Sequence, residues 1–246
     1  MTLQGKRALV TGASRGIGAA IAKALAVEGA DVAITYEKSA EAAAEVVRAI
    51  EALGRRAVAI QADSADVAAV RASIDKTVAG LGGLDILVNN AGILRLSAVE
   101  DMSLEDIDAT LNVNIRAPIV ASQAAIPHLG PGGRIINIGS FFADRVPGGA
   151  GLPVYALSKS ALTAFTQGLA RELGARDITV NVVQPGSIDT DMNPAHGPFG
   201  ETLRAITALG RYGAVEDIAD MVAFLASAKG RYITGAALTV DGGANA

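Results

Sequence analysis

Residues 11–18, Thr-Gly-Ala-Ser-Arg-Gly-Ile-Gly, follow a short apolar run at 7–10 and lead into an Ala-rich stretch that begins at Ile17. Glycines at such a turn let backbone N–H groups approach a pyrophosphate, and the following helix N-terminus supplies the positive end of its dipole. The spacing is GxxxGxG rather than the GxGxxG of the common dinucleotide fingerprint, and glycines between a strand and a helix can also be purely structural. The stretch predicts a strand, a phosphate-binding turn and a helix, in that order.

Outward from this turn, short β-branched runs alternate with Ala-rich helical stretches along the whole chain. Seven runs are expected to be strands: RALV at 7–10, DVAIT at 31–35, RAVAIQ at 56–61, LDILVNN at 84–90, GRIINIGS at 133–140, ITVNVVQ at 178–184 and GAALTV at 235–240. Such uniformly apolar strands belong in a parallel sheet covered on both faces. Right-handed crossovers then predict an α/β fold, a Rossmann-type doubly wound sheet of seven parallel strands in the order 3-2-1-4-5-6-7.

The helices are expected from Ile17, from Ala40, from Asp66, near Leu104, over 155–173 and over 216–227. No Pro/Ser-rich linker or charge block divides the chain, so we expect one dinucleotide-binding catalytic domain over residues 1–246. The least regular segment begins at Pro185, and we interpret residues 185–205 as a substrate flap. A second irregular stretch, 141–153, follows the fifth strand. Loops after strand carboxyl ends form the ligand crevice of such folds.

Composition excludes several classes of protein. Half of the 246 residues are hydrophobic and 19% are charged, but no run approaches the roughly 18 uncharged apolar residues of a membrane span. A secretory leader is not evident at the start, so we expect a cytoplasmic protein without membrane partners. The absence of cysteine and the two scattered histidines argue against a metal site. A net charge of −4 with dispersed basic residues argues against nucleic acid as a partner.

The end of the second strand bears on the choice of cofactor. A NAD-specific site usually has a carboxylate about 20 residues after the glycine turn, but Tyr36 holds that place here. Arg15 in the turn, with Lys38 and Ser39 after the second strand, can instead hold a 2′-phosphate through charge-assisted hydrogen bonds. Glu37 is the residue that would favour NAD. The sequence predicts NADP(H), with NAD as the alternative.

Tyr155 and Lys159 lie four residues apart on one face of the expected amphipathic helix. A free phenol has a pKa of about 10, and a nearby ammonium favours the phenolate and lowers that pKa. The pair can therefore act as a tuned acid, although tyrosine and lysine at this spacing also decorate many helices.

A set of motifs that occur in a fixed order favours the catalytic interpretation of this pair. The motifs are TGASRGIG at 11–18, NNAG at 89–92, NVNIRAP at 112–118, IINIGS at 135–140, YALSK at 155–159 and QPGSIDT at 184–190. Together they closely resemble the short-chain dehydrogenase/reductase family, across essentially the whole chain. The resemblance implies a carbonyl reductase of 3-oxoacyl type, acting on a small-molecule ketone or secondary alcohol. It implies that Tyr155 is the general acid/base, that Lys159 lowers the tyrosine pKa and holds the nicotinamide ribose, that Ser140 orients the carbonyl and that Asn114 anchors a water of the proton relay.

The resemblance also implies a set of cofactor contacts. Two of its members have an alternative interpretation, since Asp63 can simply cap the next helix and 89–92 can be a plain strand-end turn. The expected cofactor-binding residues are Gly12, Ser14, Arg15, Gly16, Ile17, Gly18, Tyr36, Lys38, Ser39, Asp63, Ser64, Asn90, Ala91, Gly92, Tyr155, Lys159, Pro185, Gly186, Ile188 and Thr190.

The substrate side departs from many relatives, because the interval between Ser140 and Tyr155 is longer. The pocket shape therefore does not carry over, and its expected lining is Leu94, Phe141, Phe142, Val146 and Met192. The stretches IINIGSFFADRVP and QPGSIDTDMNPAHGP also look like a bacterial branch of the family that includes a biofilm-dispersal mediator. A nucleotide-sensing regulator that retains the reductase fold is therefore the alternative function. The family resemblance and the apolar faces of the helical stretches 104–129 and 155–173 indicate a homotetramer.

Overall fold

The computed structural model describes residues 1–146 and 151–246, and residues 147–150 of the expected irregular stretch lie outside the described residues. One parallel sheet runs through the protein in the order β3-β2-β1-β4-β5-β6-β7, which confirms the predicted fold class and strand order. Its strands are β1 (Arg7–Val10), β2 (Asp31–Tyr36), β3 (Ala57–Gln61), β4 (Ile86–Asn89), β5 (Arg134–Ile138), β6 (Thr179–Pro185) and β7 (Ala237–Val240).

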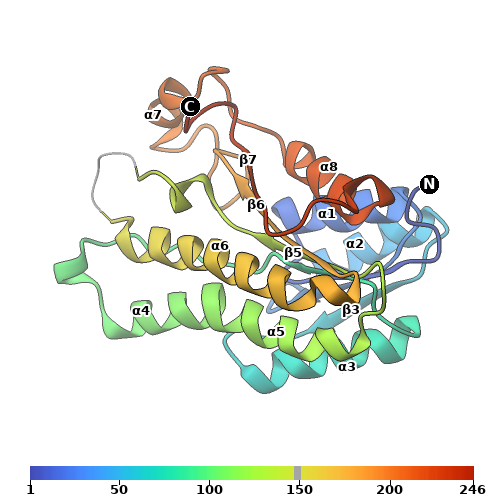
Figure 1. Ribbon diagram of the computed structural model, residues 1–246. Helices are drawn as coiled ribbons and strands as arrows, with labels where there is room; N and C mark the ends of the chain where they lie inside the picture. Colours follow the sequence, from blue (N-terminus) through green and yellow to red (C-terminus); the bar gives the residue numbers. More distant parts are fainter. Residues whose placement is uncertain (147–150) are drawn as a thin grey trace.

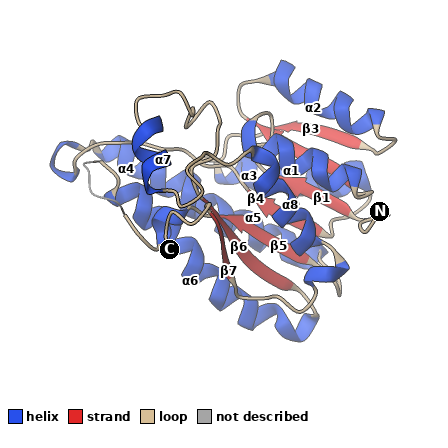
Figure 2. Cartoon of the chain, turned by 90° about the horizontal axis from the view of Figure 1, so that it is seen from above, coloured by secondary structure: helices blue, strands red, loops and turns tan. Residues whose placement is uncertain are grey.

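Helices cover both faces of the sheet (Figures 1 and 2). They are α1 (Gly16–Val27), α2 (Ala40–Ala52), α3 (Val67–Leu81), α4 (Leu104–Leu111), α5 (Ala117–Ala125), α6 (Pro153–Leu173), α7 (Gly200–Ile206) and α8 (Val215–Ala226). Apolar side chains of α1, α2 and α8 form one core with the sheet. Those of α3, α5 and α6 form a second core on the opposite face. This two-sided burial explains why the strands are so uniformly apolar.

The helices begin close to where the sequence places them. The third begins one residue later than expected, because Asp66 is its N-cap and accepts a hydrogen bond from the amide of Ala68. The expected helix near Leu104 continues past α4 through a π-helical turn, Asn112–Arg116, into α5. The predicted flap region, 185–205, contains most of α7. Of the helices in the described ranges, none is long and apolar enough to span a bilayer.

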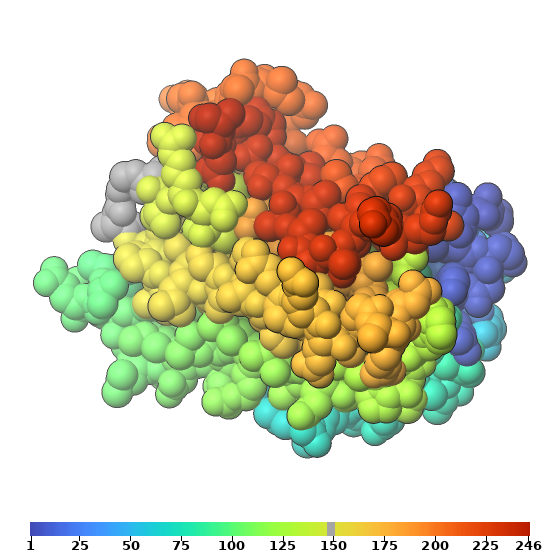
Figure 3. Space-filling model, viewed as in Figure 1, coloured from blue at the N-terminus to red at the C-terminus, as the bar shows by residue number. Residues whose placement is uncertain are grey.

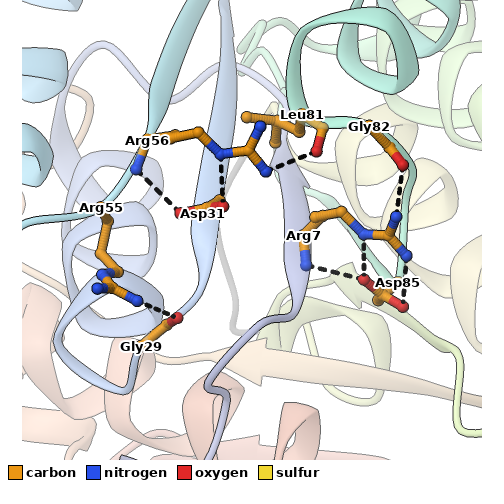
Figure 4. A network of polar contacts seen from close by, with 8 residues as sticks. All are labelled: Arg7, Gly29, Asp31, Arg55, Arg56, Leu81, Gly82 and Asp85. Atoms are coloured by element: carbon orange, nitrogen blue, oxygen red, sulfur yellow. Dashed lines mark hydrogen bonds and ion pairs between the residues drawn. The ribbon is translucent and has the colours of Figure 1, made fainter.

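Two arginine–aspartate pairs fasten the amino-terminal ends of four strands (Figure 4). Arg7 contacts Asp85 through its Nε at 2.7 Å, and Arg56 contacts Asp31 in the same way at 2.8 Å. Both guanidinium groups also donate to carbonyl groups at the end of α3, those of Gly82 and Leu81. The arginines thus place positive charge at the negative end of the α3 dipole while they join the strands.

Replacing Asp85 with asparagine should lower the free energy of unfolding at neutral pH by about 1–2 kcal/mol, because a partly buried charge-assisted bond is lost. Burial tends to raise the pKa of Asp85, but the hydrogen bonds and charge of Arg7 outweigh burial and hold that pKa below its ordinary value. The stabilisation is therefore complete above the ordinary pKa of about 4 and is lost as the pH falls through the lowered folded-state pKa.

Urea unfolding of parent and variant at pH 7 and in acid measures this effect. The difference between the two proteins should shrink in acid. The exposed Asp108 on α4 provides the control, since Asp108→Asn should change stability by less than about 0.5 kcal/mol. A difference for Asp85→Asn that stays constant with pH would show that Arg7 does not act through the ionised carboxylate.

Candidate active site

The glycine turn lies directly after β1, at the carboxyl edge of the sheet. Gly12 has a positive φ of 61°, and a Cβ on it would lie 2.9 Å from the Cα of Ala91. A Cβ on the buried Gly18 would overlap the side-chain amide of Asn90. The first and third glycines are therefore required for close packing between the turn and the end of β4, which joins two of the motifs found in the sequence.

Gly16 differs from the other two glycines, because it borders open space rather than close-packed backbone. Its φ is 55°, and a Cβ there would meet only Thr190, at 3.6 Å. Helix α1 starts at this residue without a side-chain cap from Arg15 and without an acidic residue in its first turn. Its first N–H groups have no partners within the helix. This helix end can bind an anion, and Thr190 from the segment after β6 lies beside it.

The segment after β6 approaches the same place and carries four of the predicted cofactor residues, Pro185, Gly186, Ile188 and Thr190. Pro185 ends β6. A Cβ on Gly186 would lie 2.5 Å from the Cα of Asp241, so that glycine has a packing requirement of its own. Ile188 packs into the core on the α1 side. Among the residues that the structure describes, the buried hydroxyl of Ser187 finds no hydrogen-bond partner. The open turn, the α1 N-terminus and this unused hydroxyl fit a dinucleotide that would be held here.

The expected 2′-phosphate residues lie on the exposed side of this turn. Arg15 Nη1 contacts the carboxylate of Asp191 at 3.0 Å, and both side chains are mostly exposed. Lys38 contacts Glu37 at 2.9 Å, which raises the pKa of Lys38. Tyr36 lies half-buried at the end of β2, and Ser39 precedes α2. Each of the two cations therefore faces a carboxylate that an incoming phosphate would have to replace.

The end of β4 connects the cofactor side to the catalytic side. Thr11 Oγ1 accepts hydrogen bonds from the backbone amides of Asn90 and Ala91, each at 3.0 Å. The Asn90 side chain donates to the carbonyl groups of Thr11 and Gly12. A Cβ on Gly92 would lie 3.3 Å from Lys159 Nζ and 3.4 Å from Asn114 Oδ1. A side chain at this position would crowd the lysine and the asparagine.

Asp63 and Ser64 follow β3 at the same edge of the sheet. The Asp63 carboxylate accepts from the amide of Ala65 at 2.8 Å, in a local turn. It is not the cap of α3, since Asp66 fills that position. Asp63 remains exposed and Ser64 half-buried, and their adenine contact stays a prediction.

Asn114 lies in the π-helical turn between α4 and α5, a feature often found at functional sites. It is 1% exposed, and its Oδ1 accepts from the amide of Ile93 while its Nδ2 donates to the carbonyl of the same residue, both at 2.9 Å. Nδ2 also donates to Ser158 Oγ at 3.0 Å. The side chain thus holds the loop after β4 against α6. Its Oδ1 and Lys159 Nζ both lie next to Gly92.

Helix α6 carries the predicted catalytic pair at its start, where Pro153 occupies the first turn. Lys159 Nζ donates to the carbonyl of Ile138 in β5 at 3.0 Å and lies 5.8 Å from the centre of the Tyr155 ring. Ser140, two residues after β5 ends, is buried and accepts from the amide of Phe142 at 3.3 Å. The structure therefore brings Asn114, Ser140, Tyr155 and Lys159 together.

The acid–base properties of this pair follow from burial. Burial raises the pKa of Tyr155 to about 12, and a hydrogen bond with Ser140 opposes that rise without cancelling it. Burial also lowers the pKa of Lys159 to about 8. The expectation of a lowered tyrosine pKa is therefore wrong for this arrangement, because burial of the phenol outweighs the one opposing contribution, the Ser140 hydrogen bond. At neutral pH, Tyr155 carries its proton and can donate it.

The predicted pocket residues divide into two groups. The Phe142 ring lies edge-on to the Tyr155 ring with centroids 6.3 Å apart, and Phe141 stacks behind it at 4.1 Å. Phe141 itself is 3% exposed, so it belongs to the core behind Phe142. Leu94 is half-buried after β4, whereas Val146 and Met192 are exposed on the loops around the site.

Three polar partners were absent from the sequence-based predictions. Ser158, which bonds Asn114, stands inside the YALSK motif, and Thr11 is the first residue of the glycine stretch. Both were therefore available in the motifs themselves. Asp191, the partner of Arg15, lies 176 residues away along the chain, and no local pattern indicates that contact.

Comparison with known proteins gives a consistent result. A family profile described as enoyl-(acyl carrier protein) reductase matches residues 12–245. A short-chain dehydrogenase from Burkholderia cenocepacia J2315, solved in complex with NADP, is 64% identical with a TM-score of 0.99 over 100% of both chains.

Two curated relatives carry different functional descriptions. The cyclic-di-GMP-binding biofilm dispersal mediator protein of Escherichia coli K12 is 45% identical over 97% of this chain and 96% of its own length. A 3-oxoacyl-[acyl-carrier-protein] reductase of Staphylococcus aureus Mu50 is 43% identical over 97% of each chain. With these matches and the seven-stranded fold, the chain belongs to the short-chain dehydrogenase/reductase family of oxidoreductases.

Proposed function

We propose that this protein is a carbonyl reductase that transfers hydride between NADP(H) and a ketone or secondary alcohol. The observation that carries the proposal is the convergence of Ser140, Tyr155 and Lys159 at the carboxyl end of β5, with Asn114 held beside them. Hydroxyl donors and a buried ammonium in one place suit the polarisation and protonation of a carbonyl oxygen. The 3-oxoacyl reductase relative supports this substrate class.

The residues divide the work of reduction between them. A bound nicotinamide would supply hydride to the carbonyl carbon. Tyr155 donates its hydroxyl proton to the carbonyl oxygen as the carbon–oxygen double bond becomes single, and Ser140 donates a hydrogen bond to the same oxygen. Lys159 stabilises the tyrosinate that results and passes a proton to it, and a water anchored by Asn114 would then return a proton from solvent to Lys159. The net reaction consumes one proton from solution for each alcohol formed.

NADP(H) is our proposed cofactor. Arg15 and Lys38 lie on the exposed side of the glycine turn, and no carboxylate stands at Tyr36. The NADP bound to the Burkholderia relative supports the same choice. We further propose one catalytic domain, a substrate flap at 185–205 and a homotetrameric assembly, for which the family membership is the support.

Purified protein should oxidise NADPH in the presence of an activated ketone. A panel of small cyclic ketones, 3-oxoesters and 3-oxoacyl thioesters, read by loss of NADPH absorbance, tests this and ranks the substrate classes. The apolar Phe142 beside Tyr155 favours ketones with an apolar flank. No ketone-dependent oxidation above that of the Tyr155→Phe variant across the panel would refute the reductase function.

A nucleotide-sensing regulator is the second candidate, because the biofilm-dispersal relative covers nearly the whole chain. Fold and site can persist in a protein whose effect depends on binding alone. Calorimetric titration with cyclic di-GMP, with NADPH as the positive control, separates the two functions. Binding of cyclic di-GMP together with a cellular phenotype that survives Tyr155→Phe would favour the regulator.

A further inference from the structure

The last six residues, 241–246, form a turn that begins at the active-site edge of the sheet. Strand β7 pairs in parallel with β6, and the amide of Gly186 donates to the carbonyl of Val240 at 2.9 Å. The Asp241 carboxylate then accepts from the amides of Gly243 and Asn245, at 2.8 and 2.9 Å. These bonds give the end of the chain a defined conformation beside the segment that follows β6.

One side of this C-terminal turn packs against residues 207–209, which follow α7 just beyond the flap. The amide of Leu209 donates to the carbonyl of Gly242 at 3.0 Å. A Cβ on Gly242 would lie 2.8 Å from Thr207 Cγ2, and one on Gly243 would lie 2.8 Å from Ala208 Cβ. Both glycines also have positive φ, so neither position accepts a side chain easily. The turn and the residues after α7 are therefore in tight contact.

The other side of the C-terminal turn contacts Phe141, which with Phe142 forms an aromatic wall beside Tyr155. Asn245 Nδ2 donates to the carbonyl of Phe141 at 2.8 Å, a contact between residues 104 positions apart. Phe141 stacks on Phe142, whose ring meets the edge of Tyr155. Figure 3 shows the red C-terminal residues between the yellow-green segment after β5 and the orange segment around α7.

We propose that the C-terminal turn is a brace that fixes the spacing between residues 207–209, just beyond the flap, and the Phe141–Phe142 wall, with Asn245 as the positioning residue. The inference rests on the proposed reductase function, because it assigns Phe142 to the substrate side of Tyr155. Asn245 reaches Phe142 through the backbone of Phe141. The brace therefore acts on how the carbonyl compound is held, whereas the glycine turn after β1 lies on the other side of the sheet centre.

Asn245→Ala tests the brace by two independent measurements. The KM for the carbonyl substrate should rise about threefold to tenfold, as expected for one lost hydrogen bond, while the Kd of NADPH stays within about twofold. The amides of Ala143 and Asp144, which close the turn after Ser140, should exchange hydrogen faster. Asn245→Gln should return both the KM and the exchange rates part of the way to the parent values. Asn245→Asp should return neither, because a carboxylate cannot donate a hydrogen bond to the Phe141 carbonyl. Ala246→Ser is the control and should match the parent.

The outcomes separate the brace from the function on which it rests. Unchanged exchange at Ala143 and Asp144 in Asn245→Ala would overturn the brace. An increase of the NADPH Kd by the same factor as the ketone KM would also overturn it, since the residue would then support the whole fold. A parent protein without turnover would refute the reductase function alone, because the exchange measurement still decides whether Asn245 holds the wall.

Discussion

Replacing Tyr155 with phenylalanine is expected to lower kcat for ketone reduction by about a hundredfold or more, with NADPH affinity within about twofold of the parent. The change removes the proton donor but keeps the ring that meets Phe142. Steady-state turnover and a separate NADPH titration measure the two quantities. Tyr232, which is fully exposed, supplies the matched control, since Tyr232→Phe removes a hydroxyl far from these contacts.

The pH dependence of the parent enzyme gives an independent check. With a pKa of about 12, Tyr155 stays protonated at neutral pH and supports reduction, whereas alcohol oxidation needs the tyrosinate and should accelerate as the pH rises. Lys159, with a pKa of about 8, loses its charge above that pH, so reduction should decline there. Turnover of Tyr155→Phe within about twofold of the parent would show that another group supplies the proton.

Periodicity and the glycine stretch are sufficient to predict the fold, because each depends on local chemistry. The strand order follows from right-handed crossovers between apolar strands, and all seven strands form where the sequence places them. The grouping of Ser140, Tyr155 and Lys159 was predictable for a different reason, because these residues stand in motifs whose order along the chain is distinctive. Their meeting at β5 is then a consequence of the parallel sheet.

The burial of side chains and the contacts between distant segments could not be predicted from the sequence. The direction in which the pKa of Tyr155 shifts depends on how far the folded chain removes its phenol from water. No spacing of residues along the sequence reveals that burial. The π-helical turn that carries Asn114 interrupts an otherwise ordinary helical pattern. The contacts of Arg15 with Asp191 and of Asn245 with Phe141 join segments more than 100 residues apart. Such pairs exist only after the loops at the carboxyl edge have packed together.

The Arg15→Ala variant should lose NADPH use selectively. A charge-assisted contact with the 2′-phosphate is worth roughly 1.5–3 kcal/mol, or about tenfold to a hundredfold in kcat/KM, and an exposed arginine belongs at the lower end. NADH lacks that phosphate, so its kcat/KM should fall by less than about threefold. Tyr36→Asp should shift preference toward NADH, because a carboxylate repels the phosphate and accepts from the ribose hydroxyls. Arg171→Ala, on the exposed side of α6, is the control.

A variant of Asp191 gives a second test of this assignment, because its carboxylate forms an ion pair with Arg15 at 3.0 Å. A phosphate that binds Arg15 has to displace it, so Asp191→Asn should modestly improve NADPH use, by about twofold to fivefold, and leave NADH use unchanged. Equal kcat/KM for the two cofactors in the parent, or an equal loss of both in Arg15→Ala, would contradict the assignment. Glu37 would then be the ribose-binding group, released from its contact with Lys38, and the cofactor would be NAD.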